Sequence, residues 1–186
     1  MNTKTTAVII IFTALTIALN LSPIKFPAPY APFLIYQIWE IPIVAAFLLY
    51  GTRVGIPIAI LNTLMLLAVF PGLLPTGPFY NLAAVLSMLL GIGIIKSLAK
   101  KHSPKNQLLL GGLFTVSGII LRVAAMAIVN YVFLRFPSPV GYGLNEETII
   151  AYVPLVVIFN VTLALYTIPI GHFLAELVKS SIKGFK

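Results

Sequence analysis

Long apolar runs separated by short breaks rich in Pro, Gly or charge dominate this chain. A membrane-spanning helix needs roughly 20 apolar residues, and the runs have about this length. Because lipid offers no hydrogen-bond partners, each run has to satisfy its own backbone groups as a helix. The pattern predicts helices near residues 6–21, 33–50, 54–70, 79–98, 107–136 and 153–178.

The last of these runs contains Pro154 close to its start. A proline suits the first turn of a helix, because its missing N–H would have no partner there. We therefore expect the sixth helix to begin near Val153. The preceding segment, residues 137–152, is then an outer loop, like residues 22–32 and 71–78.

Composition supports a membrane protein. Hydrophobic residues make up 60% of the chain and charged residues only 9%, whereas a soluble domain carries about 25% charged residues. The 186 residues suit one compact unit. The sequence therefore predicts a single all-α integral membrane domain over residues 1–186, a bundle of six transmembrane helices that passes repeatedly through the cell membrane.

The net charge of +8 marks topology rather than nucleic-acid binding, because Lys and Arg sit in short stretches between apolar runs with no basic face. With six spans, one side holds Lys4, Arg53, Lys96, Lys100, Lys101, Lys105, Lys179, Lys183 and Lys186. The other side holds only Lys25 and Arg135. By the positive-inside rule, both termini are predicted to be cytoplasmic.

Residues suited to catalysis or metal binding are few. The chain has four acidic residues, two histidines and no cysteine, and neither histidine has another ligand type at metal-binding spacing. Gly91 and Gly93 resemble a fragment of a phosphate loop, but they lie inside an apolar run and favour close helix packing. We expect no enzyme activity, no metal and no cofactor.

Four polar residues within the apolar runs are more informative, because each is costly in hydrocarbon and has to face the bundle interior or a cavity. They are Glu40, Arg122, Asn130 and Asn160. At ~1.5 Å per residue, the predicted helix bounds place Glu40, Asn130 and Asn160 each ~10 Å below the outer surface, and Arg122 ~20 Å below it.

Two interpretations of these polar residues remain open. They could simply hydrogen-bond neighbouring helices, and Glu40 could neutralise Arg122. Alternatively, together with Tyr36 and Trp39 from the aromatic segment above them, they form an outward-facing pocket for a planar molecule with polar edges.

In their order along the chain, several short motifs resemble the S component, the substrate-binding membrane subunit of energy-coupling-factor (ECF) vitamin transporters, with the riboflavin-specific branch closest. The matching stretches are Ala14-x-x-x-Ala18, Phe26-Pro27-Ala28-Pro29, Ala31-Pro32-Phe33-Leu34, Glu40-Ile41-Pro42, Gly51-x-x-x-Gly55, Asn130-Tyr131 and Phe159-Asn160. Together they extend over nearly the whole chain.

The resemblance implies a transported vitamin, riboflavin or a related flavin, bound from the outside by Asn130 and Asn160. It also implies that Ala14 and Ala18 dock on the T component, which joins two cytoplasmic ATPases. One position departs from the riboflavin branch, because Leu163 stands where that branch has a lysine of the binding site. The alternatives are an S component for another vitamin or precursor, a structural or assembly subunit, and an intramembrane enzyme.

Overall fold

The structure is a computed structural model that describes residues 2–69, 74–102 and 106–181. Its elements in chain order are α1 (Thr3–Leu21), β1 (Phe26–Ala28), β2 (Ala31–Tyr36), α2 (Glu40–Tyr50), α3 (Thr52–Val69), α4 (Gly77–His102), α5 (Gln107–Phe133) and α6 (Glu146–Ser181). The predicted number of helices, six, is thus found among the described residues.

Five of these helices are long and apolar enough to cross a membrane. The exception is α2, whose 11 residues extend about 16 Å, roughly half the thickness of a bilayer core. The predicted start of the second helix near Phe33 is therefore wrong, and the all-α prediction is wrong for the segment before Glu40. Residues Phe26 to Tyr36 form an antiparallel hairpin instead.

Proline explains why the hairpin replaces the first half of the predicted helix. Pro27, Pro29 and Pro32 lack backbone N–H groups and keep residues 26–32 out of a helix, and pairing with β1 carries the extended backbone on to Tyr36. Proline also pushes the residue before it towards extended backbone. Strands β1 and β2 pair Phe26 with Tyr36 at their open end, so α2 begins only at Glu40.

Helix α6 begins a full two turns earlier than predicted. Asn145 Oδ1 accepts a hydrogen bond from the backbone N–H of Thr148 at 2.9 Å, which satisfies a free donor of the first turn. Glu146 and Glu147 follow in that turn, where the helix dipole favours negative charge. Pro154 consequently lies inside the helix rather than at its start.

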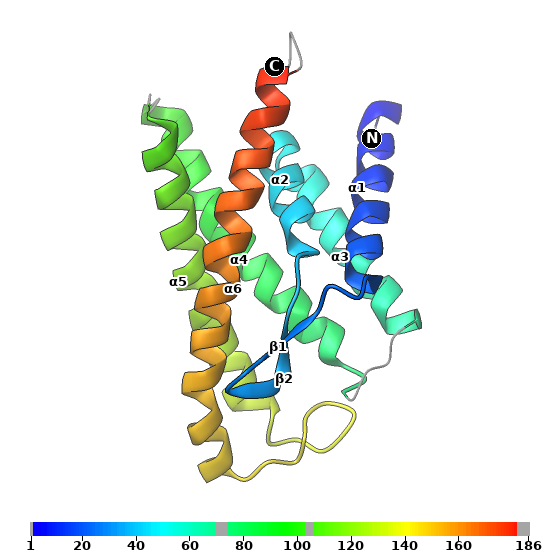
Figure 1. The fold of residues 1–186 in the computed structure, drawn as a ribbon, viewed down its shortest axis with the longest axis vertical. Coiled ribbons are helices and arrows are strands. Elements are labelled where there is room, and N and C mark those ends of the chain that lie inside the picture. The colour runs from blue at the N-terminus through cyan, green and yellow to red at the C-terminus, as the bar shows by residue number, and fades with distance from the viewer. Residues whose placement is uncertain (1, 70–73, 103–105, 182–186) are drawn as a thin grey trace.

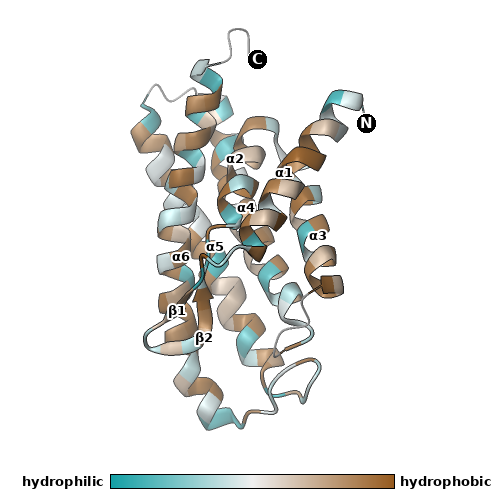
Figure 2. Cartoon of the chain, turned by 45° about the vertical axis from the view of Figure 1, so that its right-hand side comes forward, coloured by the Kyte–Doolittle hydropathy of each residue, from teal (hydrophilic) through white to brown (hydrophobic). Residues whose placement is uncertain are grey.

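The long helices run side by side, and α1 begins at the same end of the bundle at which α6 finishes (Figure 1). The hairpin β1–β2 and the connection from α5 to α6 lie towards the opposite end, which we call the hairpin end. Hydrophobic residues predominate along the helices, and hydrophilic ones occur at their ends and at scattered positions within them (Figure 2).

Glycine allows the closest helix contact. A Cβ atom on Gly91 of α4 would lie 2.4 Å from the carbonyl oxygen of Ser117 in α5, closer than any real Cβ contact. Ser117 Oγ also donates a hydrogen bond to the Gly91 carbonyl at 3.0 Å. The interpretation of this glycine as a packing residue is confirmed.

Candidate functional site

The first turn of α2 places a carboxylate inside the bundle. Glu40 is the first residue of this helix and only 2% of its surface is exposed. Because the hairpin occupies the residues before it, the short helix begins deep in the protein. The positive end of the helix dipole favours a negative charge at this position.

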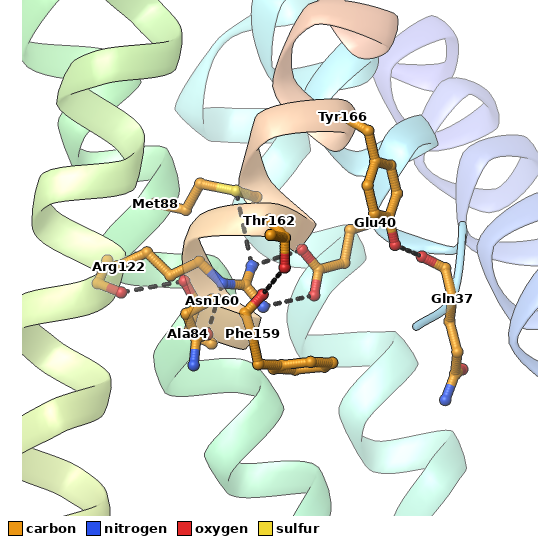
Figure 3. Close-up of polar contacts among 10 residues, drawn as sticks. Gln37, Glu40, Ala84, Met88, Arg122, Phe159, Asn160, Thr162 and Tyr166 are labelled. Carbon is orange, nitrogen blue, oxygen red and sulfur yellow. Dashed lines mark hydrogen bonds and ion pairs between the residues drawn. The ribbon is translucent and has the colours of Figure 1, made fainter. Parts of the chain in front are cut away.

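Arg122 of α5 pairs with this carboxylate in a two-pronged ion pair (Figure 3). Its Nη1 donates to Glu40 Oε2 at 2.5 Å, and its Nη2 donates to Glu40 Oε1 at 3.0 Å. Both side chains are 3% exposed. In this geometry the planar guanidinium group makes two parallel hydrogen bonds to the carboxylate. Their attraction offsets the free energy that is lost when both charged groups are removed from water. The hypothesis that Glu40 neutralises Arg122 is thus confirmed.

Asn160 of α6 completes the cluster. Arg122 Nε donates to Asn160 Oδ1 at 2.8 Å, and Asn160 Nδ2 donates to the Val156 carbonyl at 2.8 Å. Arg122 Nη1 also approaches the sulfur of Met88 in α4 at 3.6 Å. Four of the five N–H groups of this arginine therefore have partners, and four helices meet at one buried point.

The predicted arrangement by depth needs correction. Arg122, expected below the other polar residues, is the one that contacts both Glu40 and Asn160. Asn130 lies eight residues further along α5, which places it about 12 Å closer to the hairpin end. The depths were wrong because α2 and α6 begin elsewhere than the apolar pattern suggested.

Asn130 keeps an unused hydrogen-bond acceptor. Its Nδ2 donates to the Met126 carbonyl of its own helix at 2.7 Å, and the residue is 8% exposed. No side chain or backbone group in the described part of the chain donates to its Oδ1. The Asn130 acceptor is thus free for a ligand, whereas the Asn160 acceptor is occupied by Arg122.

Tyr36 fastens the hairpin to α6. Its hydroxyl lies 2.6 Å from Thr162 Oγ1 and 2.6 Å from the Tyr30 hydroxyl. Thr162 Oγ1 donates to the Ile158 carbonyl, so Tyr36 donates to Thr162 and Tyr30 donates to Tyr36. Burial, followed by this hydrogen bond, raises the pKa of Tyr30 to about 12.

Aromatic contacts strengthen the same attachment. The rings of Tyr36 and Phe159 lie 4.8 Å apart between centroids, and Tyr166 donates to the Gln37 carbonyl at 2.6 Å. Trp39, predicted to face the pocket, instead packs into the main hydrophobic core and is 5% exposed. These contacts attach the hairpin to α6 at residues next to Asn160 in the chain, whereas Trp39 belongs to the core.

Sequence reasoning missed Met88, Thr162 and Tyr166 as neighbours of the cluster. Met88 is apolar and gave no signal. Thr162 and Tyr166 lie two and six residues after Asn160, with Tyr166 one helical turn beyond Thr162. Thr162 and Tyr166 share one face of α6, but Asn160 lies on another face, so this spacing gave no sign that they lie near the cluster.

Ala14 and Ala18 lie far from this cluster, on the outer face of α1. Both are exposed, whereas Thr13, Thr16 and Asn20 form the buried face of that helix. The neighbouring exposed side chains on the outer face are large and apolar, with Ile10, Ile11 and Leu15 at 61%, 65% and 47% exposure. This small-residue patch is therefore free of intramolecular packing.

No protein-family model matches the sequence, and no curated protein matches it. A solved structure of the S component of a bacterial ECF transporter superposes on this chain with a TM-score of 0.71 and 25% sequence identity. The match covers 95% of this chain and 98% of that one. This chain has the fold of an S component.

The S-component fold supports the family that the sequence motifs predicted. It is the fold of a transporter subunit rather than of an enzyme, as the sparse catalytic inventory indicated. Together with the five apolar helices, it makes this chain a multi-pass membrane protein. The hairpin and short α2 are part of the matched region, since the match extends over nearly the whole chain.

Proposed function

We propose that this protein is the substrate-capture component of an ECF-type transporter and binds a vitamin, with riboflavin or a related flavin favoured. The observation that carries the proposal is the likeness to an S component over 95% of the chain. The closed polar cluster of Glu40, Arg122 and Asn160 beneath an aromatic hairpin supports it. Such a cluster is costly to bury in a membrane protein.

In the proposed orientation, both termini are cytoplasmic and the hairpin end faces outward. The lysines near the ends of α4 and α6 support this assignment through the positive-inside rule. The T component would dock on the exposed face of α1 at Ala14 and Ala18, where small side chains permit close approach. Two cytoplasmic ATPases would complete the transporter.

The proposed ligand lies between the hairpin and the outer part of α5 and α6. Asn130 supplies a hydrogen-bond acceptor, and the Tyr36 and Phe159 rings supply aromatic faces for a planar molecule. Asn160 acts through Arg122, whose guanidinium it orients. Opening the hairpin admits the ligand.

Leu163 bears on the choice of vitamin. It is 4% exposed, so the place of the lysine in the riboflavin branch holds a buried apolar side chain. A cation is still present nearby, because Arg122 of α5 contacts Asn160. Since that cation is largely committed to Glu40, we propose a ligand without a carboxylate or phosphate, which a flavin such as riboflavin satisfies.

Fluorescence titration of the purified protein with riboflavin tests this proposal. Binding should quench flavin fluorescence, and Asn130→Ala should weaken affinity by about tenfold, because one hydrogen bond contributes up to ~1.5 kcal/mol. Asn81→Ala is the matched control, since Asn81 is exposed on α4. Absence of riboflavin binding contradicts the flavin assignment. Absence of any co-purified vitamin by native mass spectrometry favours a structural subunit.

A further inference from the structure

A cavity of about 320 Å³ opens at the end of the bundle opposite the hairpin. It lies between α2, α4, α5 and α6, where α2, α4 and α6 finish and α5 begins (Figure 1). Its polar lining consists of Lys96, Lys100, Gln107, His172, Glu176 and Lys179. None of these residues takes part in the candidate substrate site.

Positive charge in this cavity exceeds negative charge. Three lysines line it, and Glu176 is the one acidic side chain among its described lining residues. Lys179 already pairs with Glu176 at 2.7 Å. Lys100 and Lys179 also lie close enough to Lys96 to repel its charge. Two ammonium groups therefore lack an anionic partner within the cavity.

Lys96 is held in a fixed position. Its Nζ donates to the carbonyls of Phe47 at 3.0 Å and Leu48 at 2.7 Å, at the end of α2. It also lies 5.6 Å from the centroid of the Phe47 ring. An ammonium group has three N–H donors, so one remains for a ligand. The α2 carbonyls offset only part of its charge, because a helix end carries about half an elementary charge.

The surroundings favour a lipid. Exposed apolar side chains stand on the same helix turns as the lining residues but outside the cavity, facing the lipid side of the helices: Leu108 and Leu109 beside Gln107, Phe173 beside His172 and Leu177 beside Glu176. Acyl chains pack against such side chains while a headgroup occupies the polar end. Basic pockets between transmembrane helices bind anionic headgroups in this manner.

We propose that this cavity binds the phosphate group of an anionic phospholipid, with Lys96 as the principal contact and Lys100 beside it. The site is independent of the substrate-capture function. His172 borders the phosphate position and is itself positioned by the Gln107 carbonyl at 3.3 Å.

Native mass spectrometry of the full chain in detergent tests this site, with phosphatidylglycerol as the probe and phosphatidylcholine for comparison. Lys96→Gln should weaken phosphatidylglycerol binding about fivefold, the effect of one lysine near an anionic headgroup. Arg53→Gln is the matched control, because Arg53 is exposed at the same end of the bundle but outside the cavity. Glu176→Gln should strengthen binding, because it removes the one opposing charge.

Two results would overturn the proposal. The first is equal phosphatidylglycerol binding by Lys96→Gln and Arg53→Gln. The second is binding of soluble glycerol phosphate as tight as that of the lipid, which would assign the cavity to a free phosphate compound. If the Lys96→Gln protein does not fold, the double variant Lys100→Gln/Lys179→Gln replaces it, because both of its changes fall on exposed side chains. This variant should show the same loss of phosphatidylglycerol binding.

Discussion

Glu40 and Arg122 are buried together, and each makes the other tolerable inside the membrane. Removal of one partner from a buried ion pair leaves an uncompensated charge, whereas removal of both does not. The pair joins α2 to α5, and Asn160 extends it to α6. The packing of α2, α5 and α6 against one another thus depends on one electrostatic contact.

Glu40→Gln should therefore destabilise the protein by about 3–5 kcal/mol, seen as a lower Tm of the purified protein in detergent. Glu176→Gln removes the carboxylate of a surface pair that is 40% and 31% exposed and should cost at most about 1 kcal/mol. The double variant Glu40→Gln/Arg122→Met should recover part of the lost stability. Equal Tm values for the two single variants would contradict a structural role for the pair.

The pairing could be predicted from the sequence because a glutamate and an arginine both occur within apolar runs, and each needs a partner there. Their relative depth could not, since counting along a helix requires its true first residue. The burial of Trp39 was equally hidden. An aromatic residue next to a polar one is as compatible with a core position as with a pocket.

At the level of elements, the hairpin β1–β2 has a separate attachment to the bundle. A two-stranded hairpin has little stability of its own, so its contacts with α6 decide how often it opens. The chain of hydroxyl groups from Tyr30 through Tyr36 to Thr162 is the polar part of that attachment.

Thr162→Val keeps the shape of the side chain and removes this hydrogen bond. Because one such bond contributes about 1 kcal/mol, hydrogen exchange of the β1 and β2 amides should become roughly five times faster. Amides of α5 should be unchanged. Thr148→Val on the same helix is the control, since its hydroxyl makes no hydrogen bond within the described residues. Unchanged exchange in the hairpin would show that the aromatic contacts hold it alone.

The five long helices could be predicted to within a few residues at most of their ends, because apolar length and breaks are strong signals in membrane proteins. The errors fall at Phe33 and at Val153. In the first case, residues 33–36 are as apolar as the helix after Glu40, so apolar length alone did not separate the strand from the helix. In the second, a cap at Asn145 lies in a polar segment that resembles a loop, and Pro154 suggested a later start.

For the molecule as a whole, the start of α1 and the end of α6 lie at one end of the bundle (Figure 1). The short α2 does not span a bilayer by itself. The hairpin before it supplies the rest of the path, so the hairpin and α2 together lead the chain from the hairpin end back to the end at which α1 begins. The even number of crossings that the charge distribution required is therefore kept. The side of the membrane on which the termini lie is the part that needs measurement.

Absence of cysteine from the sequence makes this measurement direct. Single cysteines introduced by Glu147→Cys and Ser180→Cys, both at exposed positions, should react differently with a membrane-impermeant thiol reagent on intact cells. We expect labelling of the Glu147→Cys protein only, with Ser180→Cys labelled after permeabilisation. The reverse pattern would contradict the cytoplasmic assignment of both termini.

The ion pair in the centre of the bundle has one more consequence. A single charge that crosses the full membrane potential changes in energy by ~2.3 kcal/mol per 100 mV. With Glu40 and Arg122 joined at 2.5 Å, the forces of that electric field on the two groups cancel. The buried centre thus offers the transmembrane voltage no net charge to act on, and any work that moves the protein within the bilayer has to come from another source.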